Sequence, residues 1–392
     1  MNTKLISATV KNFRGLDNIN LKFKDLTILV GPNASGKSNT LEALLFIKTL
    51  LKADSLPPAE FMQDLVRYGA DEAMQFSIST ANAKKTEYSF SLTTGKEDTQ
   101  VAHENLKVNE VQVIQVREGR GEVRDEDGEN CQKYHSDSDN LALSSAGNFG
   151  EKPITLELAN FIKNWEFYDL DTDLIRNAGF LPTRLRNTGS KGKRDTTIGY
   201  SGRHIQRILQ NWARSNEQVD KEKIESLNEK LSDILDIRLA LGSDQKDRIT
   251  VRESGGAKVP FHLMSDGNIR MIAYCLLLTQ SDLPPLISIE EPERNFHPGL
   301  LKNIASIIKK LSQETQVVIT SHSSQLLDCF SVEDIMTDTS VVLINKDKDF
   351  KTKACLLEDL TEKKEEVLNW MSDFGVGSAI YHSNLLKEIL DI

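Results

Sequence analysis

The octapeptide that decides the fold of this chain is Gly31-Pro32-Asn33-Ala34-Ser35-Gly36-Lys37-Ser38. It matches G-x-x-x-x-G-K-[ST], in which backbone N–H groups wrap a diphosphate and glycines leave room for its approach. A β-rich run, Thr27–Val30, precedes it, and a helix is expected from about Ser38, with its positive dipole end toward the anion. Lys37 would reach the β- and γ-phosphates of ATP, and the Ser38 hydroxyl would bind Mg²⁺. An ordinary glycine turn is the alternative, and the flanking strand and helix argue against it.

Two acids close an apolar run further along the chain, where Leu286–Ile289 is followed by Glu290 and Glu291. Carboxylates at the carboxyl end of a buried strand, beside a phosphate loop, can hold Mg²⁺ and orient the attacking water. We therefore expect Glu290 to serve the metal, through water, and Glu291 to be the general base. Two solvated acids at a strand end are the alternative interpretation.

Two further polar segments follow the same logic. The strand predicted at Gln316–Thr320 is followed by His322, which could donate to the γ-phosphate and sense its presence. A lone histidine is more often structural, but its position after the paired acids favours function. Ser265-Asp266-Gly267 precedes an apolar helix and is either an ordinary helix cap or a second anion site. Because one ATP needs only one such site, a second one indicates that it serves the nucleotide of a neighbouring copy.

The chain order of strands and helices predicts an α/β fold with a doubly wound, mainly parallel sheet. Its core is expected to comprise residues 1–75 and 255–345, interrupted by an insertion over 76–254 and followed by a C-terminal tail over 346–392. Short β-rich runs between Gln75 and Val123 predict an antiparallel sheet inside the insertion, and helical periodicity follows it. The polar, acidic stretch Gly119–Gly150 has little to pack and is expected to be a loop or partly disordered.

Composition limits the partners. A net charge of −10 and a pI of 5.4 argue against a chain that coats nucleic acid along its whole surface. A local basic cluster is either a solvated loop or a phosphate-contacting one: Arg184, Arg186, Lys191, Lys193 and Arg194. No apolar run approaches the roughly 20 residues that span a bilayer, no signal-peptide block is present, and the four cysteines are scattered. These features predict a cytoplasmic protein without a membrane partner.

The order of these elements resembles the ABC-type ATPase heads of RecF, SMC and OLD proteins. Val10–Gly15 is similar to their opening N-F-[KR] segment, and Gly36–Ala43 to their G-K-S-N-x-L-E-A run. Ile289–Glu293, followed by His297-Pro298, resembles the E-E-P-E…H-P segment of OLD-like ATPases. The resemblance implies that Arg14 contacts adenine and that Asn39 belongs to the nucleotide-binding set.

The same resemblance implies a homodimer with two copies head to tail. Each ATP would lie between Gly31–Ser38 of one copy and Ser265–Gly267 of the other, and Phe167–Arg176 is the candidate segment that senses the γ-phosphate. Two departures stand out. Asp266 occupies the place of a glycine in transporters, and Glu290 that of the commoner aspartate.

Three functions compete at this point. OLD proteins carry a Toprim nuclease, but only about 70 residues follow His322 here, and Asp347-Lys348-Asp349 is interpreted as a polar turn rather than a metal site. The leading hypothesis is therefore an ATPase subunit that controls a separately encoded effector, such as a nuclease or toxin, as in the two-gene anti-phage systems Septu and PARIS. A RecF-like DNA-repair clamp is the alternative. A transporter subunit is disfavoured because the chain has no L-S-G-G-Q signature.

Overall fold

The computed structural model describes residues 3–70, 72–82, 84–95, 98–135, 140–148, 150–178, 197–241, 249–253, 255–361, 365–382 and 386. It divides the chain into two compact units. The first unit comprises Met1–Trp165, Pro284–Ser288 and Thr315–Ile392, and the second comprises Glu166–Leu283 and Ile289–Glu314. The three-part division predicted from the sequence, with boundaries after residues 75, 254 and 345, stays a prediction.

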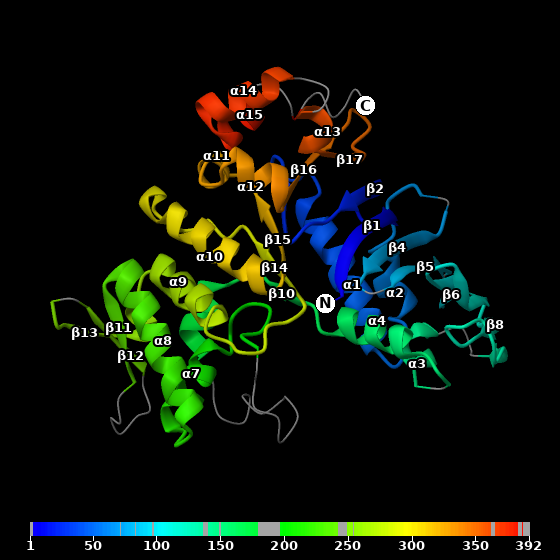
Figure 1. Ribbon diagram of the computed structural model, residues 1–392, viewed down its shortest axis with the longest axis horizontal. Helices are drawn as coiled ribbons and strands as arrows, with labels where there is room; N and C mark the ends of the chain where they lie inside the picture. Colours follow the sequence, from blue (N-terminus) through cyan, green and yellow to red (C-terminus); the bar gives the residue numbers. More distant parts are fainter. Residues whose placement is uncertain are drawn as a thin grey trace. The chain divides into compact units, whose positions relative to one another are not determined.

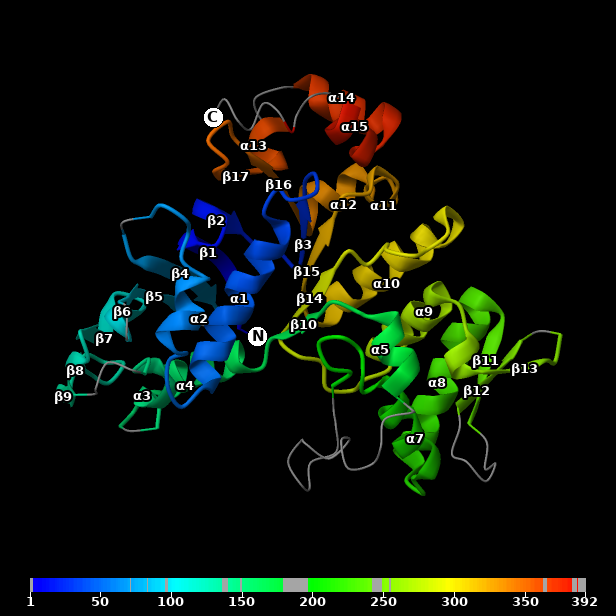
Figure 2. The same ribbon diagram turned by 180° about the vertical axis from the view of Figure 1, so that it is seen from behind.

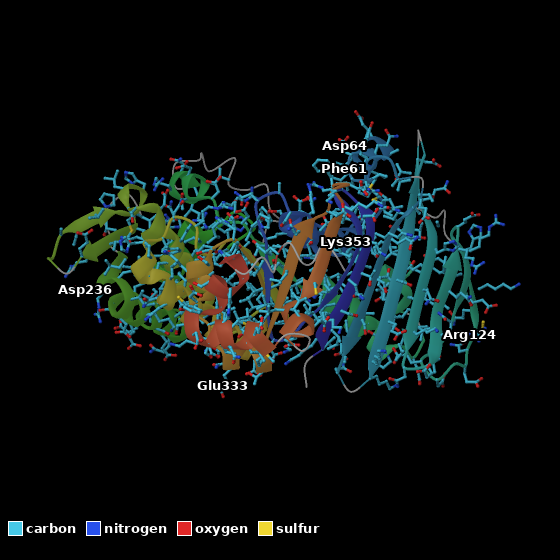
Figure 3. The ribbon with its side chains drawn as sticks, turned by 90° about the horizontal axis from the view of Figure 1, so that it is seen from above. Phe61, Asp64, Arg124, Asp236, Glu333 and Lys353 are labelled. Carbon is cyan, nitrogen blue, oxygen red and sulfur yellow. The ribbon has the colours of Figure 1, made fainter. Side chains whose placement is uncertain are left out.

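An antiparallel sheet of eight strands lies in the first unit, in the order β2-β1-β4-β5-β6-β7-β8-β9. Apolar residues alternate along it, so that the side chains of Phe76 and Phe90 stack with ring centroids 5.0 Å apart. Figure 3 looks down on this sheet and labels Arg124, the residue after β8, near its β8–β9 end. The strands are β1 (Lys4–Phe13), β2 (Leu16–Lys22), β4 (Met74–Ala81), β5 (Lys85–Thr94), β6 (Thr99–Val108), β7 (Val111–Arg117), β8 (Arg120–Val123) and β9 (Gln132–His135).

A second sheet has six strands in the order β10-β14-β15-β3-β16-β17. Its strand β3 is buried at every residue and pairs in parallel with both β15 and β16, as expected for a strand inside an α/β sheet. The predicted α/β fold, with parallel and antiparallel sheets, is confirmed. The strands are β3 (Leu26–Val30), β10 (Glu166–Tyr168), β14 (Leu286–Glu290), β15 (Gln316–Ser321), β16 (Thr339–Lys346) and β17 (Thr352–Leu356).

The prediction that Gly119–Gly150 is a loop or partly disordered was wrong for three segments of it. They form β8, β9 and the short helix α3 (Leu143–Ala146), which precedes α4 (Pro153–Lys163). The physical reason is a small buried core, since Leu141, Ala142 and Leu143 are at most 1% exposed. The backbone N–H groups of Ala142 and Leu143 both donate to the buried carboxylate of Glu104 on β6, at 2.5 and 2.8 Å.

Helices of the first unit flank these sheets. The glycine loop leads into α1 (Lys37–Lys52), and Figure 1 shows α1 beside the N-terminal strand β1, with which it is in contact. Described parts of the predicted C-terminal tail also form helices, and at the start of α15 (Val376–His382) Asp328 accepts hydrogen bonds from the N–H groups of Gly377 and Ser378. The remaining helices are α2 (Ala59–Gln63), α11 (Ser324–Leu327), α12 (Val332–Thr337), α13 (Leu357–Thr361) and α14 (Glu365–Phe374).

The second unit is mainly helical and includes a small antiparallel sheet of three strands (Figure 2). Its central helix, α9, is buried at every residue from Ile269 to Leu277. Its elements are α5 (Thr172–Asn177), α7 (Ile205–Arg214), α8 (Gln218–Leu235), α9 (Asp266–Leu277), α10 (Leu301–Glu314), β11 (Ile237–Leu241), β12 (Ile249–Glu253), β13 (Lys258–Pro260) and the 3₁₀ turns η2 (Phe261–Leu263) and η3 (Pro298–Leu300). The predicted basic cluster at 184–194 lies outside the described residues.

None of the helices in the described part of the chain is long and apolar enough to cross a membrane.

The buried carboxyl of Glu104 yields a prediction about stability. Burial raises its pKa to about 7, against the lowering effect of hydrogen bonds from Leu143, Ala142 and the Tyr88 hydroxyl. The folded state therefore holds an extra proton between pH 4.5 and 7, and the free energy of unfolding falls as the pH rises through that window. In urea titrations, we expect a slope approaching ~1.4 kcal/mol per pH unit that Glu104→Gln removes.

The matched control is Glu110→Gln, at an exposed position in the turn after β6. It should keep the slope of the wild type. An equal slope in Glu104→Gln would show that another group is responsible.

Candidate functional site

The predicted phosphate loop connects the buried strand β3 to α1, and its glycines are required by the surrounding protein. A Cβ added at Gly31 would lie 2.0 Å from the carbonyl oxygen of Ile344, on the neighbouring strand β16. Gly36 has a φ of +114°, and a Cβ there would lie 2.8 Å from the Thr352 hydroxyl on β17. Both glycines thus allow the loop to turn tightly against the edge of the sheet.

The side chains of Ser35 and Lys37 are buried within the loop, whereas Ser38 is exposed. The Lys37 ammonium is buried and donates to the carbonyl oxygens of Gly31 and Pro32, at 2.8 and 2.9 Å. The helix start at Gly36 has no side-chain cap, which leaves the first N–H groups of α1 without this kind of partner. In the described part of the chain the buried Ser35 hydroxyl also has no hydrogen-bond partner. This is the environment of an anion site at a helix N-terminus.

His322 emerges at the same edge of the sheet as the loop. Parallel pairing places Ser321 opposite Val30, so the residues that follow these two strands, His322 and Gly31, leave the sheet together. His322 is exposed, and the next residue, Ser323, caps α11 with its side chain. The structure therefore brings the predicted sensor histidine and the predicted phosphate loop to one side of the first unit.

Thr352, which belongs to none of the predicted motifs, connects the opening segment at Gly15 to the phosphate loop. The Thr352 hydroxyl lies 3.1 Å from the carbonyl oxygen of Gly15 and 3.2 Å from that of Ser35. Arg14 has a positive φ of 48° and forms an ion pair with Glu42 on α1. A side-chain amide of α1, that of Asn39, packs against Gly15. Arg14 and Asn39 are thus both anchored beside the start of α1.

In the second unit, Glu291 is held in an unusual conformation. Its φ is 41°, in the left-handed region that costs a non-glycine residue of order 1 kcal/mol or more. The Arg294 guanidinium lies 3.1–3.2 Å from the Glu291 carboxylate and also donates to Asp169 at 3.2 Å. Partial burial lowers the pKa of Arg294, but Asp169 and Glu291 outweigh it and hold that pKa above the ordinary value. Glu290, the last residue of β14, is half-buried.

The start of α9 carries the other predicted motif. Ser265 is the N-cap, and its hydroxyl accepts the N–H of Asn268 at 3.3 Å. Asp266 uses both carboxylate oxygens, accepting from Arg176 at 2.5 Å and from Asn295 at 3.2 Å. The Arg176 guanidinium holds the pKa of Asp266 below its usual value. Gly267 follows, and a Cβ there would lie 3.1 Å from the Asn295 carbonyl oxygen, a tight contact that would require a small shift.

This contact joins two segments that the sequence had treated separately. Arg176 ends the candidate sensor segment, Phe167–Arg176, and also donates to the carbonyl oxygen of Met264 at 3.0 Å. From α9, the buried Arg270 donates to the carbonyl oxygen of Leu170 in the same segment. The start of α9 and the segment Phe167–Arg176 are therefore held together by hydrogen bonds donated from each to the other.

Metal binding rests on few candidate groups. Among the described residues, no group of three or more His, Cys, Asp or Glu could hold a metal ion. A serine hydroxyl such as that of Ser38, in the first unit, and a carboxylate such as that of Glu290, in the second, are each oxygen ligands of the kind that Mg²⁺ takes. At the D-x-D sequence, Asp347 accepts the N–H groups of Asp349 and Lys351, both at 2.9 Å, which is the geometry of a polar turn.

Comparison with known proteins identifies the family of the chain. Residues 26–328 match the family model described as "AAA domain, putative AbiEii toxin, Type IV TA system", and the chain belongs to that family. Over 344 residues it is 24% identical to an ATP/GTP phosphatase of Helicobacter pylori (strain ATCC 700392 / 26695), covering 82% of this chain and 86% of that protein. Over 70 residues, 18% of each chain, it is 41% identical to the DNA replication and repair protein RecF of Anaeromyxobacter sp. (strain K).

Solved structures give the same fold. An Smc head bound to the C-winged helix domain of ScpA aligns over 91% of this chain and 99% of its own, with a TM-score of 0.50 and 14% sequence identity. The protein is thus an ABC-type ATPase of the RecF/SMC kind, and it binds and hydrolyses ATP.

The packing of Gly31 predicts the effect of one methyl group. Gly31→Ala would place a Cβ against the Ile344 carbonyl, so the loop or β16 must move. We expect a loss of stability of about 1–3 kcal/mol and no measurable ATP binding in a fluorescent-nucleotide titration. Gly255→Ala is the control, because a Cβ there meets nothing within 4 Å. Unchanged ATP affinity in Gly31→Ala would contradict the tight packing of the loop.

Proposed function

We propose that this ATPase is a switch subunit, in which two copies pair head to tail around ATP and thereby control a separately encoded effector. The observation that supports it best is the second helix start, at Ser265–Gly267. It has the capping serine and the close-packed glycine of an anion site, and it belongs to a different unit from the phosphate loop. A chain that binds one ATP needs a second such site only if it serves another copy.

The residue roles follow from the loop geometry and the motifs. Lys37 would exchange its two carbonyl partners for the β- and γ-phosphates. The phosphates are charged and the carbonyl oxygens are neutral, so the ammonium binds the phosphates more strongly. Backbone N–H groups of the loop would bind the phosphate oxygens, except at Pro32, which has no N–H and only shapes the loop. The loop residues are Gly31, Pro32, Asn33, Ala34, Ser35 and Gly36. Ser38 and Glu290 would hold Mg²⁺, which supplies charge neutralisation at the phosphates. Arg14 and Asn39 would contact the nucleotide beside α1.

Glu291 would act as the general base. Its ion pair with Arg294 and its positive φ fix the direction of the carboxylate, which favours a positioned group over a mobile surface acid. His322 would donate to the γ-phosphate, since it leaves the sheet at the same edge as Gly31.

Asp266 stands at the signature position that a glycine occupies in transporters, and this difference needs an explanation. A carboxylate at the signature would repel the γ-phosphate of a neighbouring copy if its charge were unbalanced. Arg176 and Asn295 occupy both of its oxygens, so the helix start keeps its attraction for an anion. The same Arg176 belongs to the segment proposed to sense the γ-phosphate. Phosphate binding could therefore be transmitted from the signature to Phe167–Arg176 through this one pair.

Head-to-tail pairing predicts that two dead variants rescue each other. Lys37→Ala disables the phosphate loop, and Ser265→Arg disables the signature, so each alone should lack ATPase activity. In a mixed dimer, one of the two composite sites combines the intact loop of one chain with the intact signature of the other. With random pairing we expect about a quarter of the wild-type rate from the mixture. A mixture as inactive as its parts would contradict a shared site.

The nature of the effector is proposed from similarity. The E-E-P-E…H-P segment resembles OLD-like ATPases of two-gene anti-phage systems, and the family description includes a putative toxin of a toxin–antitoxin system. A nuclease or toxin encoded beside this chain is the corresponding partner, acting in the cytoplasm. A RecF-like clamp that holds DNA is the second candidate, favoured by the local 41% identity to RecF.

The experiment that decides between them is a pull-down from the native host with tagged Glu291→Gln protein, with and without ATP. Loss of the base should trap the ATP-bound dimer, so a nuclease or toxin-like protein should co-purify in an ATP-dependent manner. The control is Glu314→Gln, an exposed acid at the end of α10. DNA alone in the ATP-dependent fraction, removable by nuclease and by salt, would replace the effector hypothesis with the clamp.

A further inference from the structure

A hollow of about 440 Å³ lies within the second unit, where α7 ends, α8 begins and the segment after α9 passes. Figure 1 shows α7 and α8 side by side at this point. Its lining combines an aromatic ring, two cations, two acids and several amide or hydroxyl groups. The residues that carry the argument are Trp212, Arg214, Asp220, Lys223 and Asp282. The phosphate loop belongs to the first unit, so this hollow is built from other elements.

Asp220 is the group in the hollow that lacks a partner. It is only 7% exposed, and no described residue forms a hydrogen bond or ion pair with its side chain. Its carboxylate oxygens are not among the fully enclosed polar atoms that lack a partner, so they face the hollow, beside the first turn of α8. The hollow is therefore suited to a ligand that brings hydrogen-bond donors to Asp220.

The rest of the lining restricts which donor fits. Lys223 places its ammonium 5.6 Å from the centroid of the Trp212 ring, and Arg214 lines the same hollow. These cations would repel an arginine or lysine side chain of a partner protein, although either could donate to Asp220. They would attract phosphate, and the Trp212 ring offers a surface for a planar base.

We propose that this hollow binds a guanine nucleotide. The N1–H and exocyclic amine of guanine present two adjacent donors, which match the two oxygens of the Asp220 carboxylate. The base would lie beside Trp212, and its phosphate would meet Arg214 and Lys223. Adenine has an acceptor at N1 where guanine has a donor, so it would oppose one carboxylate oxygen. A volume of about 440 Å³ is in the range of small-ligand pockets.

The test is calorimetric titration of the full chain with GMP, whose single phosphate disfavours the loop at Gly31–Ser38. We expect saturable binding of GMP, with AMP at least about tenfold weaker. Saturating ATP and the variant Lys37→Ala should leave GMP binding unchanged. A short guanine-containing oligonucleotide, titrated in parallel, distinguishes a free nucleotide from the same base in a nucleic acid.

The decisive variant is Asp220→Asn, which replaces one acceptor with a donor. It should bind XMP better than GMP, because xanthine presents N1–H beside a carbonyl oxygen, whereas loss of fold would weaken both. Asp282→Asn, an exposed acid in the same hollow, is the matched control and should keep the preference for GMP. Absence of GMP binding, displacement by ATP, equal affinity for AMP, or no change of preference in Asp220→Asn would each overturn the proposal. None of these outcomes bears on the switch function, which depends on other residues.

Discussion

The close packing of Gly31 against the Ile344 carbonyl is the constraint on which the nucleotide site depends. Strand β3 is enclosed by β15 and β16, so the chain that leaves it must turn at once, and a side chain at Gly31 would meet β16 at 2.0 Å. The same parallel register brings His322 to that edge. Thr352 then connects the loop to Gly15, which fixes the opening segment as well. The shape of the nucleotide site is therefore determined mainly by backbone packing around the phosphate loop, with few side chains involved.

Paired charges organise the second unit in a comparable way. Arg176 and Arg294 each satisfy an acid of a predicted motif, Asp266 and Glu291, and each also reaches a second acceptor. An arginine fork can do this because its donors point in fixed directions. A lysine at either place would hold one acid and leave the second contact unmade. The motif acids are therefore positioned by residues that lie outside the motifs, which makes these arginines part of the site's geometry.

Features that are determined by consecutive residues could be predicted from the sequence. Gly31–Ser38, the strand before it and the helix after it are written in consecutive residues, and the acids after β14 follow from an apolar run that ends in charge. The roles of Thr352 and Arg294, and the pairing of Arg176 with Asp266, could not be predicted, because they arise from contacts with residues far along the chain or from a loop conformation. The prediction for Gly119–Gly150 was wrong in part, because it rested on local composition alone. Its composition is polar, yet Leu141–Leu143 bury themselves against Glu104, and a few apolar residues sufficed to order it.

Two acids of the second unit, Asp266 and Asp220, differ in whether the protein supplies partners for their carboxylates. Asp266 is partly exposed and has both oxygens occupied, so it can serve the start of α9 without opposing an anion. Asp220 is far more buried and has no partner among the described residues. Asp220 has no such partner, and its oxygens are not among the fully enclosed polar atoms that lack one, so they face the hollow, where a donor from a ligand can reach them. That it has none, in a hollow bordered by two cations and an indole, is why we assign the hollow to a ligand rather than to imperfect packing.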